Sequence, residues 1–159
     1  MAITKKGYFL AGTINGVVPS IRNYRLLAVT TATVYEGTPL TTSTVNGRFK
    51  AVTQSTDAVY GVLGCTVTPQ TYSSTAEYPV YLADDVNVFL VESSESTTPS
   101  AQIGQPASIV ISTTGDFTIT FADPATACMR VVDTTETAVD TAKTGAKYVV
   151  KFTSGKFGG

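Results

Sequence analysis

The sequence predicts an all-β protein, namely an antiparallel β-sandwich or barrel with an extended N-terminal arm and little helix. The 159 residues include 28 Thr and 19 Val, and β-branched side chains pack well on a pleated sheet. Short apolar runs alternate with Gly, Pro, Asn and Asp turn signals at intervals of roughly 8–12 residues, a spacing typical of sandwiches and barrels. No stretch shows a sustained helical period.

The N-terminal residues 1–23 are predicted to be an extended arm, because Pro19 and three glycines interrupt the segment and no helical period appears. Such an arm frays or lies on something else, either a neighbour or the body of the protein. The β-rich domain is expected at 24–153, with a candidate subdivision near 92–106, where a Ser/Thr/Pro-rich stretch indicates a loop. The Gly-rich tail 154–159 is predicted to be flexible.

Within the domain, turn and strand signals alternate. Asn46-Gly47 is the strongest hairpin signal, since both positions of a type I′ turn need positive φ. Asp84-Asp85 indicates a tight turn, and residues 117–121 alternate apolar residues with Thr, as a half-buried strand does. Residues 134–143 allow one helical turn. Strands are expected at 25–29, 32–35, 48–53, 58–68, 78–83, 86–91, 107–112, 117–121, 128–133 and 147–153.

The charge pattern favours contact with other proteins. Only 14% of residues are charged and the net charge is −1, so no bulk attraction to nucleic acid or to an anionic membrane is expected. Residues 1–50 carry a net +5, residues 51–129 carry −8 with no Lys or Arg, and the remainder carries +2. Either folding mixes these charges within one globule, or the acidic part of one subunit meets the basic part of a neighbour.

The side chains that enzymes commonly use are scarce. The chain has no His, which removes the usual general base and the commonest metal ligand, so no enzyme activity and no cofactor or metal are expected. Three alternatives have weak support: calcium at Asp84, Asp85 and Asn87, a glycosidase carboxylate pair, and an isopeptide crosslink from Lys147 or Lys151. Cys65 and Cys128 are predicted to be reduced thiols, although one long-range disulfide stays open.

The best candidates for partner contact lie near the N-terminus. Arg22, Tyr24 and Arg25 combine residue types that are enriched at interface hot spots, and Lys5 and Lys6 belong to the predicted arm. The apolar run after these lysines is too short for a signal peptide, and no segment approaches 18 apolar residues. An aromatic group without interleaved Lys or Arg favours packing over nucleic-acid stacking; it comprises Tyr60, Tyr72, Tyr78, Tyr81 and Phe89.

Several short runs are similar to one protein family. VYEGTPL at 34–40, YGV at 60–62, YPVYLA at 78–83, RVVD at 130–133 and YVVKF at 148–152 resemble the small capsid decoration (cement) proteins of tailed bacteriophages. The resemblance implies a β-rich subunit, often a trimer, that binds outside an expanded capsid at local symmetry axes. It also implies an N-terminal arm that contacts the capsid. No catalytic residues come with this family.

The expected function is therefore that of a structural virion protein, made in the host cytoplasm, that binds the major capsid protein and stabilises the capsid from outside. A homotrimer without nucleic-acid or membrane contact is expected. One alternative is another virion component, such as a head fibre, tail or minor capsid protein. The second is a carbohydrate- or ligand-binding β-domain, which predicts a concave pocket lined by tyrosines and acids. Decoration predicts a convex body with flat apolar patches.

Overall fold

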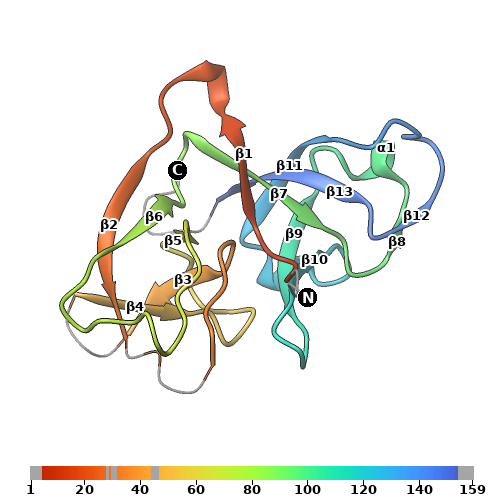
Figure 1. Ribbon diagram of the computed structural model, residues 1–159. Helices are drawn as coiled ribbons and strands as arrows, with labels where there is room; N and C mark the ends of the chain where they lie inside the picture. Colours follow the sequence, from red (N-terminus) through yellow and green to blue (C-terminus); the bar gives the residue numbers. More distant parts are fainter. Residues whose placement is uncertain (1–4, 28, 30–31, 44–46, 154–159) are drawn as a thin grey trace.

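The computed structural model describes residues 5–27, 29, 32–43 and 47–153, and it consists of two β-structures lying side by side (Figure 1). One is a closed five-stranded barrel and the other a six-stranded antiparallel sheet. With 44% of residues in strands and 7% in helices, the predicted all-β class is confirmed.

The barrel contains β2 (Ile21–Leu26), β3 (Pro39–Thr42), β4 (Arg48–Ala51), β5 (Gly61–Leu63) and β6 (Tyr78–Leu82), in the order β2-β4-β3-β5-β6. Its pairs are antiparallel except β2–β4, a short parallel pair that closes the barrel. The predicted hairpin forms between β3 and β4; Gly47 has φ 70°, and Asn46 lies outside the described residues. The barrel core consists of Leu26, Val29, Leu40, Phe49, Leu63, Val67 and Val80.

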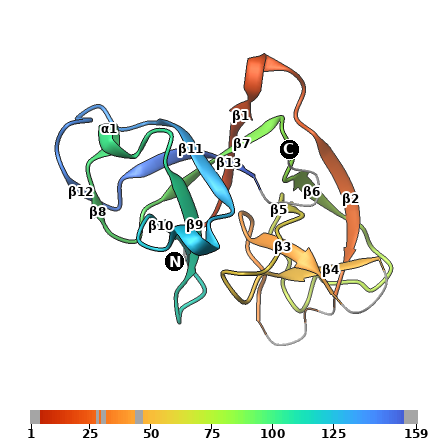
Figure 2. The ribbon, with the colours of Figure 1, turned by 180° about the vertical axis from the view of Figure 1, so that it is seen from behind.

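The six-stranded sheet follows the order β1-β7-β13-β11-β9-β10 (Figure 2). Its strands are β1 (Phe9–Thr13), β7 (Asn87–Glu92), β9 (Pro106–Ile111), β10 (Phe117–Thr120), β11 (Met129–Thr134) and β13 (Lys147–Phe152). Large side chains from β7, β10, β11 and β13 fill the core beneath it. Val52, Val59 and Val62 from the barrel region belong to the same buried cluster, so the barrel and the sheet are packed on one another.

The remaining elements are short. A 3₁₀ turn η1 (Ile14–Gly16) follows β1, and η2 (Pro124–Thr126) precedes β11. The Ser/Thr/Pro-rich stretch contains β8 (Ser96–Thr97), which pairs with β12 (Lys143–Thr144), and one helical turn α1 (Pro99–Gln102). The helical turn that residues 134–143 allowed is absent from this described stretch.

The described part of the predicted arm is extended, but it is built into both β-structures. β1 pairs with β7 at one edge of the sheet, and β2 pairs with β6 in the barrel. Tyr8 is fully buried in the large core cluster. The boundary drawn after residue 23 therefore falls inside β2, because β-sheet pairing rather than helical or alternating periodicity anchors this segment.

The chain crosses from barrel to sheet between β6 and β7, at residues 83–86, and not in the 92–106 stretch. Asp84 forms the predicted turn, since its Oδ1 accepts hydrogen bonds from the backbone N–H groups of Val86 and Asn87, both at 3.0 Å. The turn does not make a hairpin, because the strands on its two sides belong to different β-structures.

Candidate interaction surface

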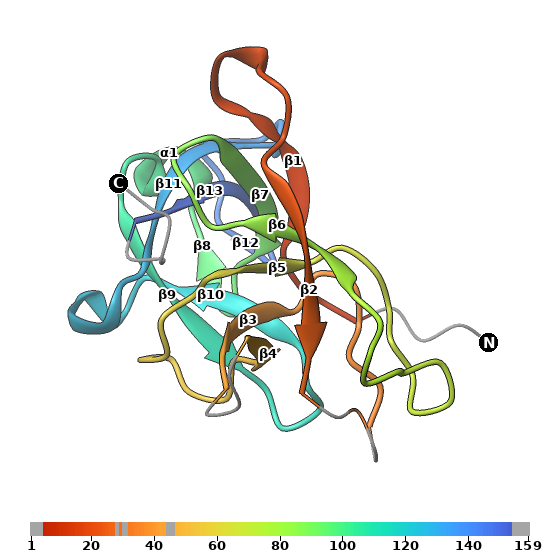
Figure 3. The ribbon, with the colours of Figure 1, turned by 90° about the vertical axis from the view of Figure 1, so that its left-hand side faces the viewer.

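The connection from β1 to β2 projects from the body of the protein (Figure 3). It carries three large apolar side chains in solvent: Val17 is 50% exposed, Val18 86% and Ile21 48%. We call residues 14–21 the apolar tip. The sequence signal for it is an apolar Val-Val pair directly after Asn15-Gly16, which does not belong to the charged and aromatic residues predicted for partner contact.

The apolar tip is held to the body by defined hydrogen bonds. The backbone N–H of Ile14 donates to the Val86 carbonyl at 2.8 Å. The side chain of Asn87, which is fully buried, accepts from the Ser20 N–H at 3.1 Å and donates to the Ser20 and Leu82 carbonyls at 2.7 and 3.0 Å. Because both ends are fixed to the β6–β7 connection, the apolar side chains are presented on a preorganised loop.

The predicted contact residues of β2 do not form a single patch. Arg22 and Arg25 are exposed, whereas Tyr24 is half-buried with its ring 4.6 Å from that of Phe49. Successive side chains of a strand point to opposite faces, so the two arginines lie on opposite faces of β2. Within the described part of the chain, neither arginine has a carboxylate partner.

The two predicted contact lysines hold the N-terminal segment in place. The Lys6 N–H donates to Asp116 Oδ1 at 2.9 Å, and the Lys6 carbonyl accepts from the Phe117 N–H at 3.0 Å. Lys6 Nζ lies 3.8 Å from Glu92. Lys5 Nζ donates to the Thr114 carbonyl and lies 5.8 Å from the centre of the Tyr35 ring.

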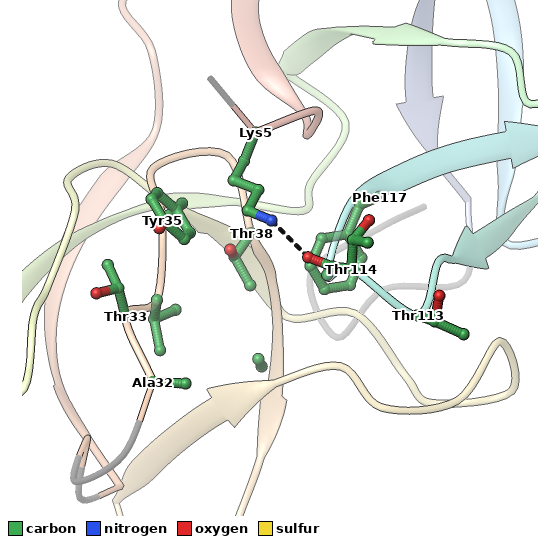
Figure 4. Close-up of a pocket in the computed structure, with 11 residues that line it drawn as sticks. Lys5, Ala32, Thr33, Tyr35, Thr38, Thr113, Thr114 and Phe117 are labelled. Carbon is green, nitrogen blue, oxygen red and sulfur yellow. Dashed lines mark hydrogen bonds between the residues drawn. The ribbon is translucent and has the colours of Figure 1, made fainter. Parts of the chain in front are cut away.

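Lys5 also stands at the mouth of a cleft between the barrel and the sheet (Figure 4). This inter-sheet cleft has a volume of about 510 Å³. One wall comes from residues 32–35 and the other from the β9–β10 turn, residues 113–115, with Phe117 behind it. Among the described residues, its lining includes one tyrosine and no acidic side chain, so it differs from the pocket of tyrosines and acids that the ligand-binding alternative predicts.

Several charges pair within the subunit. Lys6–Glu92 at 3.8 Å and Lys151–Asp85 at 3.0 Å each join a basic end of the chain to its acidic middle. Arg48 is used structurally, donating to the Leu26 carbonyl at 2.9 Å and to the Ser74 carbonyl at 3.1 Å. Folding thus mixes part of the charge within one globule and leaves the two β2 arginines without an ion pair among the described residues.

The tyrosines and cysteines singled out in the sequence are packed against other parts of the protein. Tyr60, Tyr72 and Tyr78 pack against the barrel core. Cys65 is half-buried and Cys128 buried, and both are free thiols; burial raises the pKa of Cys128 to about 11. Burial, with a smaller contribution from Glu36, raises the pKa of Cys65.

The described residues contain no group of three or more His, Cys, Asp or Glu side chains arranged to hold a metal ion. The side-chain oxygen of Asn87 accepts from the Ser20 N–H, and Asp84 Oδ1 accepts from backbone N–H groups of a turn. No helix within the described ranges is long and apolar enough to cross a membrane. Comparisons with protein families and with curated proteins found no match to this chain.

Proposed function

We propose that this protein is a structural virion protein that binds the outer surface of a phage capsid and stabilises it. The observation that carries the proposal is the apolar tip, where Val17, Val18 and Ile21 are each about half exposed or more. Contiguous apolar surface on a soluble protein commonly marks a site of contact with another protein. The resemblance to decoration proteins supports a capsid as that partner.

The way the tip is held supports a role in binding rather than in a mobile linker. The hydrogen bonds from Asn87 to Ser20 and from Ile14 to Val86 fix the loop before any partner arrives. A preorganised loop loses less conformational entropy on binding, so more of the apolar contact appears as affinity. Arg22 follows directly and is available to a carboxylate on the partner.

The surface chemistry is consistent with a permanent assembly. A surface rich in Thr and Ser and low in charge costs less to desolvate than one covered by Lys and Glu. We propose a homotrimer, since a closed ring would present three tips to the capsid at once. Multivalent attachment of that kind raises the overall affinity without requiring a tight single contact.

Co-sedimentation with capsids tests the proposal. The partner is the capsid assembled from the major shell protein encoded in the same genome. Val18→Asp is expected to lower occupancy at least tenfold, because it places a charge in an apolar contact. Val132→Asp is the matched control, since Val132 is 41% exposed on β11, which β7 and β13 separate from β1 in the sheet. Wild-type protein that does not sediment with capsids rejects the proposal.

The alternatives give different outcomes in the same assay. A head-fibre, tail or minor capsid role predicts that the protein sediments with a different particle or at a few copies per virion. A carbohydrate-binding domain predicts retention on a glycan array together with indifference to capsids. If Val18→Asp and Val132→Asp lower capsid occupancy equally, the contact with the capsid does not lie at the apolar tip.

A further inference from the structure

We propose that the inter-sheet cleft binds an extended peptide segment carrying a carboxylate, by pairing that segment with the free backbone edge of residues 33–35. This inference does not depend on the capsid proposal, since it concerns a different surface. The cleft volume of about 510 Å³ lies within the ordinary range of roughly 300–1,000 Å³ for ligand sites.

The first observation is the unpaired edge. Val34 forms an isolated antiparallel bridge with Val67, with N–H to carbonyl distances of 2.9 and 2.8 Å. In an extended chain, the backbone groups of adjacent residues point to opposite edges. The backbone N–H and carbonyl of Thr33 and the N–H of Tyr35 therefore point away from Val67, while the Tyr35 carbonyl accepts from the Thr38 N–H at 3.2 Å. Among the described residues, the N–H of Tyr35 and both backbone groups of Thr33 have no hydrogen-bond partner.

The second observation is how the cleft meets this edge. Four consecutive residues, 32–35, line it, whereas a cleft lying on one face of a strand would contact alternate residues. The cleft thus runs along the backbone. On the opposite side it is bounded by residues 113–115 and Phe117, so a segment added to the edge would lie between the barrel and the β9–β10 turn (Figure 4).

The third observation is the charge at the mouth of the cleft. Lys6, Lys143 and Lys151 each face a carboxylate within 4 Å, but Lys5 has none among the described residues and binds a carbonyl and a tyrosine ring instead. An ammonium group has three donors, so Lys5 keeps donors for a ligand. A carboxylate on the bound segment would supply the missing counter-charge and fix its direction.

This binding mode is strand addition, in which main-chain hydrogen bonds provide affinity and flanking side chains provide selectivity. Thr33, Thr38 and Thr113 offer hydroxyls to polar residues of the segment, while Val34, Ala51 and Phe117 offer apolar contact. A proline at a position facing Thr33 or Tyr35 would abolish pairing, because it has no N–H to donate.

The probe is a display library of random peptides of about seven residues, roughly 23 Å long when extended, panned on the whole protein. Enriched peptides should carry Asp or Glu and lack central proline. Synthetic copies should lose about tenfold in affinity toward Lys5→Met, the effect expected for a hydrogen bond to a charged group. Lys6→Met is the matched control, because the Lys6 ammonium pairs with Glu92 and does not line this cleft.

A scan of the peptide with N-methyl groups tests the pairing on unaltered protein. Strand addition predicts that N-methylation weakens binding at every second position and is tolerated between them. The proposal is overturned if no peptide is enriched, if Lys5→Met and Lys6→Met bind the peptides equally, or if the scan shows no alternation. A melting curve for each lysine variant ensures that a folding defect is not taken for loss of the site.

Discussion

Replacement of Tyr8 by Ala should destabilise the whole protein, although the residue lies in a segment without a core-like sequence pattern. Tyr8 is fully buried, its ring centre is 5.4 Å from that of Phe152, and its hydroxyl donates to the Thr118 carbonyl at 3.3 Å. Its backbone N–H donates to the Gly37 carbonyl of the barrel region at 2.8 Å. Tyr8 thus contacts both β-structures.

The magnitude follows from these contacts. Truncating a buried aromatic residue to Ala costs about 3–5 kcal/mol, and the hydroxyl contributes about 1 kcal/mol of that in a buried hydrogen bond. For a protein of this size, each kcal/mol lowers Tm by roughly 2–4 °C. Tyr8→Ala should therefore lower Tm by roughly 6–20 °C, and Tyr8→Phe by only a few degrees.

Thermal unfolding followed by circular dichroism measures the effect, with Phe9→Ala as the neighbouring control. Phe9 is 39% exposed, so its truncation should cost clearly less. A Tm for Tyr8→Ala equal to or above that of Phe9→Ala would refute the core role of the N-terminal segment. By the same reasoning, a chain lacking residues 1–23 should fail to fold, because it lacks β1 and half of β2.

Two further predictions concern buried polar groups. Burial raises the pKa of the Cys128 thiol from 9.0 to about 11, so the unfolded chain loses this proton at lower pH than the folded protein does. The free energy of unfolding should therefore fall by about 2–3 kcal/mol as pH rises from 9 to about 11. Urea unfolding under reducing conditions should show a flatter alkaline decline for Cys128→Ala, and equal slopes would contradict a buried thiol. Asn87→Ala should cost about 2–4 kcal/mol, because it removes three hydrogen bonds made by a fully buried side chain, one of them the bond from the Ser20 N–H. Amide exchange at Ser20 should rise in that variant before exchange in β13 does, and unchanged protection at Ser20 would show that Asn87 does not hold the tip.

Several strand positions were predictable because local patterns determine them, but no strand was expected at β1 or β3, and residues 32–35 form only an isolated bridge at Val34. Residues 147–153 and 128–133 were expected as strands and correspond to β13 and β11. The pairing was less predictable, since a turn such as Asp84-Asp85 has the same signals whether it joins two strands of one sheet or crosses between two. The alternation at 117–121 indicated a half-buried strand, yet Thr118 is buried as well.

The candidate surface was only partly predictable for a similar reason. Arg22 and Arg25 were selected by residue type, and the structure leaves both exposed, but on opposite faces of β2. Val18 was not selected, because an apolar residue in a sequence is usually assigned to the core. Its exposure depends on the bonds of Asn87 to Ser20, which are 67 positions apart. The sequence indicates Lys5 only as a charged residue of the arm. The cleft beside it could not be predicted, because it forms only where the barrel and the sheet meet.

The anchoring of residues 5–8 between two β-structures constrains the order of events during synthesis. Lys6 and its partner Asp116 are separated by 110 positions. At about 5–20 residues per second, a ribosome needs roughly 5–20 s to supply the second after the first. Until β7 has been made, β1 has apolar residues and no sheet partner, so slowed elongation or the absence of chaperones should lower the yield of native protein.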